Sequence, residues 1–103
     1  MLRFCLHYGI HFLVPVMLAA TIYPHKWKKV SLILLLGIVI DLDHLLSTPV
    51  FDPNRCSINF HPLHTYWAIM VYVSLFVVKK TRIIGLALLI HILADIVDCQ
   101  FIP

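Results

Sequence analysis

The sequence predicts an all-α fold, a polytopic membrane protein built as one four-helix transmembrane bundle over residues 1–103. First, 61% of the residues are apolar and only 13% are charged, whereas a soluble domain is about a quarter charged. Second, short polar stretches divide the chain into four apolar segments. Third, these segments are continuous apolar runs, which favours helices that satisfy their own backbone hydrogen bonds in lipid.

The four predicted spans cover about residues 4–23, 30–46, 62–78 and 83–102. Crossing the hydrocarbon layer takes about 20 helical residues, so the first and fourth segments fit and the second is just adequate. The third is long enough only if Pro62 is its first helical residue, a position where the missing N–H is harmless. Arg3 before an apolar run resembles a signal peptide, but the run contains His7 and His11, and we expect it to be retained.

Basic residues predict the orientation of the chain. Six of the eight Lys and Arg lie in the two loops after the first and third spans, namely Lys26, Lys28, Lys29, Lys79, Lys80 and Arg82. Because short basic loops stay cytoplasmic, both termini and the Thr48–Asn59 loop should face outward from an inner, cytoplasmic membrane. This explanation of the positive charge leaves no reason to expect nucleic-acid binding. Free or buried thiols are the more ordinary interpretation of the three cysteines, but a Cys56–Cys99 bridge is possible if both residues face an oxidising compartment. A homodimer is also possible.

Ionisable residues gather near the outward ends of all four spans. Several of them are three or four residues apart within one predicted helix, so the two members of each such pair lie on the same helix face. The candidate metal ligands are His7, His11, Asp41, Asp43, His44, His61, His64, His91 and Asp95. Asp98 lies at the same level, where it can alternatively sit among lipid headgroups, whereas His25 lies in a cytoplasmic loop.

A bound metal explains this gathering. An ionised Asp in mid-span costs about 2.5–3.5 kcal/mol, and the spans offer no cations as partners. One such His/Asp or His/His pair alone is more often a hydrogen-bonded pair in a protein core. Ionisable residues converging from four separate segments instead favour the binding of one or two divalent ions. Mixed imidazole and carboxylate donors suit zinc best, with manganese or iron as alternatives.

The order of these motifs resembles the inner-membrane metal-dependent hydrolases typified by the LexA-regulated YdjM-like proteins. "DLDH" at 41–44 matches the family's D-x-D-H, and "HILAD" at 91–95 matches its H-x-x-x-D. The resemblance implies metal ligands at Asp41, Asp43, His44, His91 and Asp95, with His7 or His11 as the histidine of the first span. Where the family has His-Arg-Gly-x-x-His-Ser this chain has "HPLHT", so either His61 or His64 is the counterpart, and His64 is the better match. Kinship with zinc-dependent phospholipase C enzymes would imply phosphoester chemistry.

These observations together predict a membrane-embedded metal-dependent hydrolase that cleaves a phosphoester of a lipid or lipid-like substrate at the outward face. Asp43 or Asp98 would act as general base, and Arg55 would bind the headgroup. A transition-metal or proton transporter is an alternative, although the inner halves of the spans carry almost no polar residues. A small structural subunit whose metal staples the helices is another alternative. A haem-carrying bundle is a fourth, in which the Asp residues would have no purpose.

Overall fold

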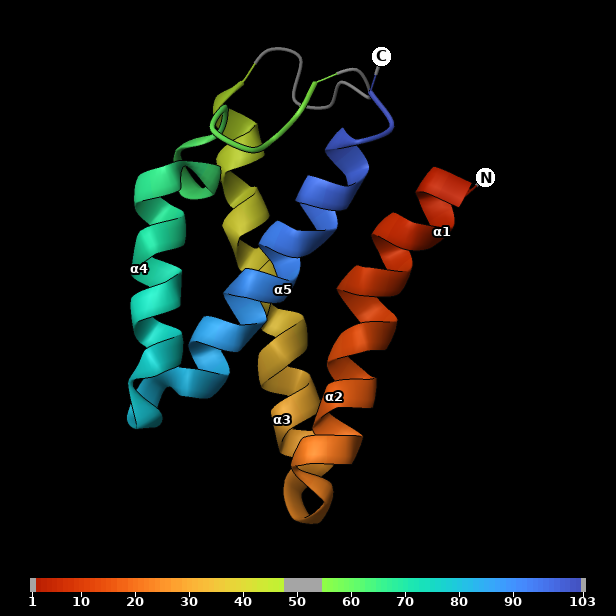
Figure 1. Ribbon diagram of the computed structural model, residues 1–103, viewed down its shortest axis with the longest axis vertical. Helices are drawn as coiled ribbons and strands as arrows, with labels where there is room; N and C mark the ends of the chain where they lie inside the picture. The colour runs from red at the N-terminus through yellow and green to blue at the C-terminus, as the bar shows by residue number, and fades with distance from the viewer. Residues whose placement is uncertain (1, 48–54, 103) are drawn as a thin grey trace.

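Four helical segments run beside one another in the computed structural model, which describes residues 2–47 and 55–102 (Figure 1). These residues contain α-, π- and 3₁₀-helices and no strand. The molecule measures 42 × 31 × 20 Å along its principal axes. The all-α, four-helix part of the prediction is therefore confirmed.

The first segment is a continuous helix, Leu2–Ile22, with a π-helical turn in its middle. It consists of α1 (Leu2–Tyr8), the π-helix η1 (Gly9–Leu13) and α2 (Val14–Ile22). The Val14 N–H bonds the carbonyl of Gly9, five residues back. Pro15 follows directly and has no N–H to give the His11 carbonyl, so a regular α-helical ladder cannot continue here. Such π turns often lie at functional sites.

The second segment changes helix type half-way along. After a 3₁₀ turn, η2 (Pro24–Lys26), the α-helix α3 (Trp27–Leu35) passes into an eleven-residue 3₁₀-helix, η3 (Leu36–Leu46). The predicted span of about 30–46 thus corresponds to most of α3 and the whole of η3, which ends at Leu46. A 3₁₀-helix has three residues per turn, so Asp41 and His44 come to lie on the same side of η3.

The third and fourth segments are shorter than predicted. Pro62 begins a separate 3₁₀ turn, η4 (Pro62–His64), and α4 covers Tyr66–Val77. Between them Thr65 is extended, and its hydroxyl accepts the Ala68 N–H as the N-cap of α4. After the turn η5 (Lys79–Thr81), α5 covers Arg82–Cys99. The predicted span of about 62–78 therefore divides into η4 and α4, and that of about 83–102 corresponds to α5, which ends at Cys99.

Among the described residues, one helix is long and apolar enough to cross a membrane by length and composition, namely Leu2–Ile22. The expectation of four such helices is corrected on this point. The helix α4 has only 12 residues, and the α-helical part of the second segment has nine. The 18 residues of α5 include Arg82, Asp95 and Asp98.

The helix α5 lies at the centre of the bundle and contacts all three other segments (Figure 1). Two glycines allow close approach: a Cβ at Gly37 would lie 2.5 Å from the Ala87 carbonyl oxygen, and one at Gly85 would collide with the backbone of Phe76. Toward the basic turns the core is apolar, with a buried cluster of Ala19, Val30, Leu34, Ala87 and Ile90.

The start of α1 and the end of α5 lie at the opposite end of the bundle (Figure 1). There Arg3 and His7 of α1 lie close to Asp98 of α5. The possible Cys56–Cys99 disulfide is present and ties the segment before η4 to the last residue of α5. Of the predicted outward loop Thr48–Asn59, residues 48–54 lie outside the described residues.

Candidate metal centre

All nine predicted metal ligands fall into three groups that could hold a metal ion. In each group the ligating atoms lie within 4.8 Å of one another. The first group is Asp41, His64, His91 and Asp95; the second is His7, His11 and Asp95; the third is Asp43, His44 and His61. The predicted convergence of histidines and carboxylates from four separate segments is thus present in the structure.

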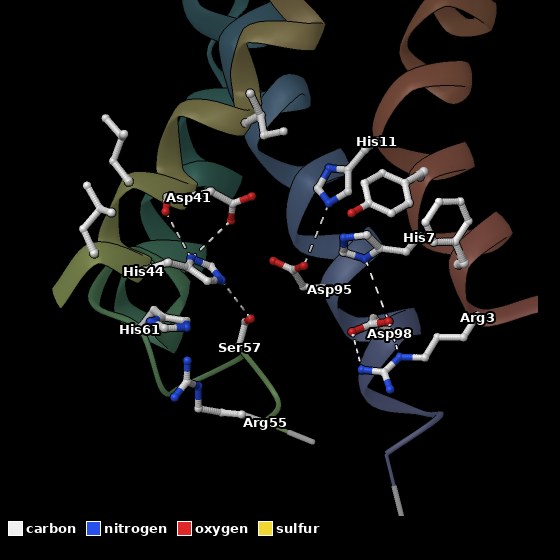
Figure 2. A pocket seen from close by; sticks show the side chains of 15 residues that line it. Arg3, His7, His11, Asp41, His44, Arg55, Ser57, His61, Asp95 and Asp98 are labelled. Atoms are coloured by element: carbon white, nitrogen blue, oxygen red, sulfur yellow. Dashed lines mark hydrogen bonds and ion pairs between the residues drawn. The ribbon is translucent and has the colours of Figure 1, made fainter. Parts of the chain in front are cut away.

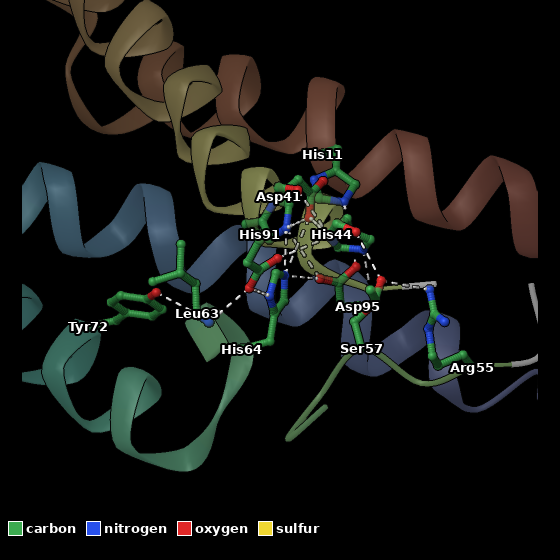
Figure 3. A network of polar contacts seen from close by, with 12 residues as sticks. His11, Asp41, His44, Arg55, Ser57, Leu63, His64, Tyr72, His91 and Asp95 are labelled. Atoms are coloured by element: carbon green, nitrogen blue, oxygen red, sulfur yellow. Dashed lines mark hydrogen bonds and ion pairs between the residues drawn. The ribbon is translucent and has the colours of Figure 1, made fainter. Parts of the chain in front are cut away.

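The first group is the tightest. Its atoms are Asp41 Oδ1 from η3, His64 Nε2 from η4, and His91 Nε2 and Asp95 Oδ2 from neighbouring turns of α5 (Figure 3). The distance from His64 Nε2 to Asp41 Oδ1 is 3.4 Å, to His91 Nε2 3.2 Å and to Asp95 Oδ2 2.9 Å. From His91 Nε2 it is 2.8 Å to Asp41 Oδ1 and 3.2 Å to Asp95 Oδ2.

These spacings fit a single small cation. A regular tetrahedron with edges of about 3.1 Å has its centre about 1.9 Å from each corner, close to the 2.0–2.2 Å of zinc–nitrogen and zinc–oxygen bonds. His64 is 0% exposed and His91 2%, so the imidazole nitrogens are shielded from bulk water. The donor set and its size therefore suit a tetrahedral divalent metal.

Hydrogen bonds alone do not satisfy the first group. A neutral imidazole has one N–H, and the Nδ1 of His64 uses it by donating to Asp43 Oδ2 at 2.9 Å. The Nε2 lone pair of His64 then faces the other imidazole and two carboxylates. Asp95 Oδ2 is buried without a hydrogen-bond partner although two imidazole nitrogens lie close to it. The Nε2 of His91 is hydrogen-bonded to Asp41 Oδ1 at 2.8 Å, so the unsatisfied ligand atom of this group is Asp95 Oδ2. Close approach to two imidazole nitrogens without a hydrogen bond is what a ligand of a shared metal would show.

Asp43 Oδ2 accepts the hydrogen bond of His64 Nδ1 and thereby orients the His64 ring. Its Oδ2 also accepts the backbone N–H of Leu63 at 2.8 Å, and the Leu63 carbonyl in turn accepts the Tyr72 hydroxyl at 2.7 Å. Asp43 is only 4% exposed. A carboxylate that holds the far nitrogen of a metal-ligating histidine fixes its tautomer and raises its basicity. The structure therefore gives Asp43 a positioning role in addition to the predicted roles of metal ligand and general base.

The third group shares Asp43. The Nδ1 of His44 lies 3.1 Å from Asp43 Oδ1 and 3.1 Å from the Asp41 carbonyl, and its Nε2 lies 3.5 Å from the Ser57 hydroxyl. The His44 and His61 rings stack with their centroids 3.9 Å apart. Burial, with a smaller effect of the neighbouring His44, lowers the pKa of His61 below its ordinary value. His61 is thus a neutral imidazole at pH 7, the form that binds metals.

A pocket of about 620 Å³ opens onto this polar end, between η3 on one side and α1 on the other (Figure 2). Asp41, His44, His61 and Asp95 line it together with His7 and His11. Apolar side chains form another part of the wall: Phe4, Tyr8, Ile38, Leu42 and Leu45. The pocket therefore brings an apolar surface up against the candidate ligands.

The remaining predicted site residues also line the pocket. Arg55 lies there with its guanidinium over the Phe60 ring, and it donates to the Ser47 hydroxyl at 3.3 Å. Asp98 accepts two hydrogen bonds from Arg3, Nε to Oδ1 at 2.7 Å and Nη2 to Oδ2 at 3.0 Å (Figure 2). The paired Arg3 neutralises the carboxylate that sequence reasoning had considered as a general base.

Sequence reasoning missed Arg3 and Ser57 as parts of the pocket. Arg3 was noted only as a residue ahead of the first span, and its separation of 95 residues from Asp98 hides the pairing. The predicted topology places Arg3 and Asp98 at the same outward end of the spans, and this placement could have suggested the pairing. Ser57 lies next to Cys56, so the possible disulfide to the end of α5 was the signal that could have placed it.

Comparison with known proteins gives a family but no function. No curated protein and no solved structure matches the chain. Residues 1–102 match a family of unknown function, DUF6122. Because this match covers nearly the whole chain, the protein belongs to the DUF6122 family.

Proposed function

We propose that this protein is a membrane-embedded metal-dependent hydrolase that cleaves a phosphoester of a lipid or lipid-like amphiphile at the outward face of the membrane. The observation that supports it most is the convergence of Asp41, His64, His91 and Asp95 at one buried point beside a large pocket. The likeness of "DLDH" and "HILAD" to the motifs of the YdjM-like hydrolases supports the same activity.

Zinc is the ion we propose, because two imidazoles and two carboxylates at tetrahedral spacing are zinc-like ligands. Manganese and iron accept the same donor types and are alternatives. A bound divalent ion supplies Lewis-acid chemistry, in that it polarises a substrate oxygen and activates water near neutral pH. Asp43 keeps the Nε2 lone pair of His64 directed at the ion by holding the opposite nitrogen of the ring.

The distribution of apolar side chains supports a place in the bilayer. Among the residues that the structure describes, thirty large apolar side chains are exposed, whereas the buried positions include four histidines and two aspartates. Soluble monomers rarely expose continuous apolar surface of this extent. Ionisable groups inside and apolar groups outside are the arrangement expected of helices surrounded by lipid.

The disulfide and the basic turns support the proposed orientation. The Cys56–Cys99 bond lies at the same end as the candidate ligands, and disulfides persist on the oxidising side of a membrane. Lys26 and Lys79 lie in turns at the opposite end of the bundle. Basic turns stay cytoplasmic, so both features point the pocket outward.

The lining of the pocket supports a phosphate-bearing amphiphile as substrate. Arg3 and Arg55 are the two guanidinium groups in the lining, and their positive charge favours a phosphate-bearing ligand. Arg3 is already paired with Asp98, so Arg55 is the group that we propose near the phosphate. Phe4, Leu42 and Leu45 offer contact for an acyl or prenyl chain. His44, held through Nδ1 by Asp43, has its other nitrogen on the pocket side, where it can move a proton to or from the reacting group.

Two observations favour hydrolysis over the rival functions. An ion conductor needs polar groups along the whole path, but the described core toward the basic turns is the apolar cluster around Ala19 and Leu34. Four tetrahedral protein ligands by themselves would resemble a structural zinc site. Hydrolysis is favoured because Asp41 and Asp95 border an open pocket, from which a further ligand can approach the ion.

The test combines metal content with activity. Protein purified without added metal should contain zinc, and Asp41→Ala and Asp95→Ala should lose most of it, whereas His25→Ala at the opposite end should retain it. The metal-loaded protein should release phosphate or a phosphorylated headgroup from a panel of phospholipids and prenyl phosphates. A metal-loaded protein inert toward the whole panel, or metal content unchanged in both aspartate variants, would refute the proposal.

A further inference from the structure

We propose that a second metal ion binds between His7, His11 and Asp95, next to the first, and that Asp95 is the carboxylate that bridges the two. This inference rests on the proposed function, because it assumes that the first group holds an ion. The site would then be binuclear. The ligands of the second ion would come from the N-terminal helix, as His7 and His11, and from α5, as Asp95.

The strongest indication is a pair of imidazole nitrogens without partners. His7 Nδ1 and His11 Nε2 are both buried and make no hydrogen bond. His11 is 7% exposed, so water does not substitute for the missing partner. A buried polar atom without a partner is unfavourable by about 1–3 kcal/mol, and two in the same place, four residues apart on one helix, indicate an absent cation.

Asp95 has one oxygen directed toward each group. Its Oδ2 lies 2.9 Å from His64 Nε2 in the first group. Its Oδ1 lies 3.9 Å from His11 Nε2 in the second (Figure 2). Carboxylates that bridge two metals use their two oxygens in this way, with the ions about 3.5–4 Å apart. The rings of His11 and His91, one from each group, already lie with their centroids 4.3 Å apart.

The local helix geometry brings the two histidines together. His7 ends the last turn of α1 and His11 lies in the π turn η1, and their ring centroids are 4.5 Å apart. Beyond His7, the Arg3–Asp98 ion pair closes the outer side of this position, with Asp98 Oδ1 4.0 Å from His7 Nδ1. Three protein ligands next to the pocket leave a coordination position for substrate.

The second ion should bind more weakly than the first. The 3.9 Å from His11 Nε2 to Asp95 Oδ1 exceeds the spacings within the first group, which span 2.8–3.4 Å. The helix Leu2–Ile22 must therefore move slightly toward α5 to complete the position. Two neighbouring ions on this pocket would favour a phosphate monoester or diester, whose oxygens can contact both.

The test uses manganese as a probe in the purified full-length protein, after a chelator has removed any metal bound during purification. Titration calorimetry should show two sequential Mn²⁺ equivalents, and electron paramagnetic resonance should show the exchange-coupled spectrum of a bridged pair. His7→Ala and His11→Gln, made separately, should each bind one equivalent and show the six-line spectrum of an isolated ion. His25→Ala should behave like the unmodified protein.

The outcomes distinguish this inference from the proposed function. One equivalent in the unmodified protein would overturn the second site and leave the first intact, whereas none would overturn both. Two equivalents without exchange coupling would overturn the bridging role of Asp95. The unmodified protein gives these results by itself, so the test does not depend on whether a histidine variant folds.

Discussion

Asp43 illustrates how much one residue's position changes its role. The sequence allows it to be a ligand or a base, but in the structure one oxygen holds His64 and the other lies against His44. A residue with both oxygens engaged by imidazoles controls the direction of two rings at once. Its contribution to metal binding is therefore indirect.

We predict that Asp43→Asn lowers zinc affinity about 10–100-fold without abolishing binding, because the amide neither fixes the His64 tautomer nor raises its basicity. Competition with a chromophoric chelator measures this change. Asp41→Ala, which removes an oxygen of the first group itself, should reduce binding far more. Equal losses in the two variants would place Asp43 among the direct ligands.

At the scale of single elements, the close packing of η3 on α5 determines whether Asp41 reaches His91. Gly37 allows this contact because there is no Cβ between it and the Ala87 carbonyl. The site depends on this approach, since the distance from Asp41 Oδ1 to His91 Nε2 is only 2.8 Å.

We predict that Gly37→Ala destabilises the fold by about 1–3 kcal/mol, as expected for overpacking, and lowers metal affinity as well. Gly9→Ala is the matched control, because a Cβ there meets nothing within 4 Å. Alanine in a helix is intrinsically favoured over glycine, so the control should be neutral or slightly stabilising. Thermal unfolding in detergent compares the two, and similar melting temperatures would refute the argument.

The disulfide joins Cys56 to Cys99, which are 43 residues apart in sequence. We predict that Cys56→Ser lowers the free energy of unfolding by about 2–4 kcal/mol, because the unfolded chain regains the freedom of a long loop. Cys5→Ser, which changes the exposed free cysteine, should have no such effect. Denaturant titration of both variants under non-reducing conditions provides the measurement. An unchanged unfolding midpoint in Cys56→Ser would contradict a structural role for the bond.

At the scale of the whole molecule, the proposed membrane orientation predicts which residues are accessible from outside the cell. In a Cys5→Ser background, Leu2→Cys should react with an impermeant thiol reagent in intact cells, because the proposed orientation places the N-terminus outside. Lys79→Cys should react only after the membrane is opened, because the same orientation places its turn in the cytoplasm. Labelling of Lys79→Cys in intact cells would reverse the orientation.

Hydropathy and residue spacing alone determined the all-α four-helix class and the nine candidate ligands. The helical class is confirmed because long apolar runs favour helices. The nine residues stay predicted ligands, found because ionisable residues in such runs stand out wherever they occur. Hydropathy and spacing also placed the ligands at one end, since helical topology alternates direction with each turn of the chain.

Only the tertiary structure decided how the nine ligands divide into groups. Grouping depends on distances of 2.8–3.9 Å between atoms of separate segments, and these follow from the Gly37 contact, the π turn before Pro15 and the break at Thr65. The hydrophobic periodicity of the sequence reveals none of these three features. Each depends on a single residue that changes either the local packing or one backbone hydrogen bond. Likewise, the pairing of Arg3 with Asp98 required the two ends of the chain to meet, which local sequence does not encode.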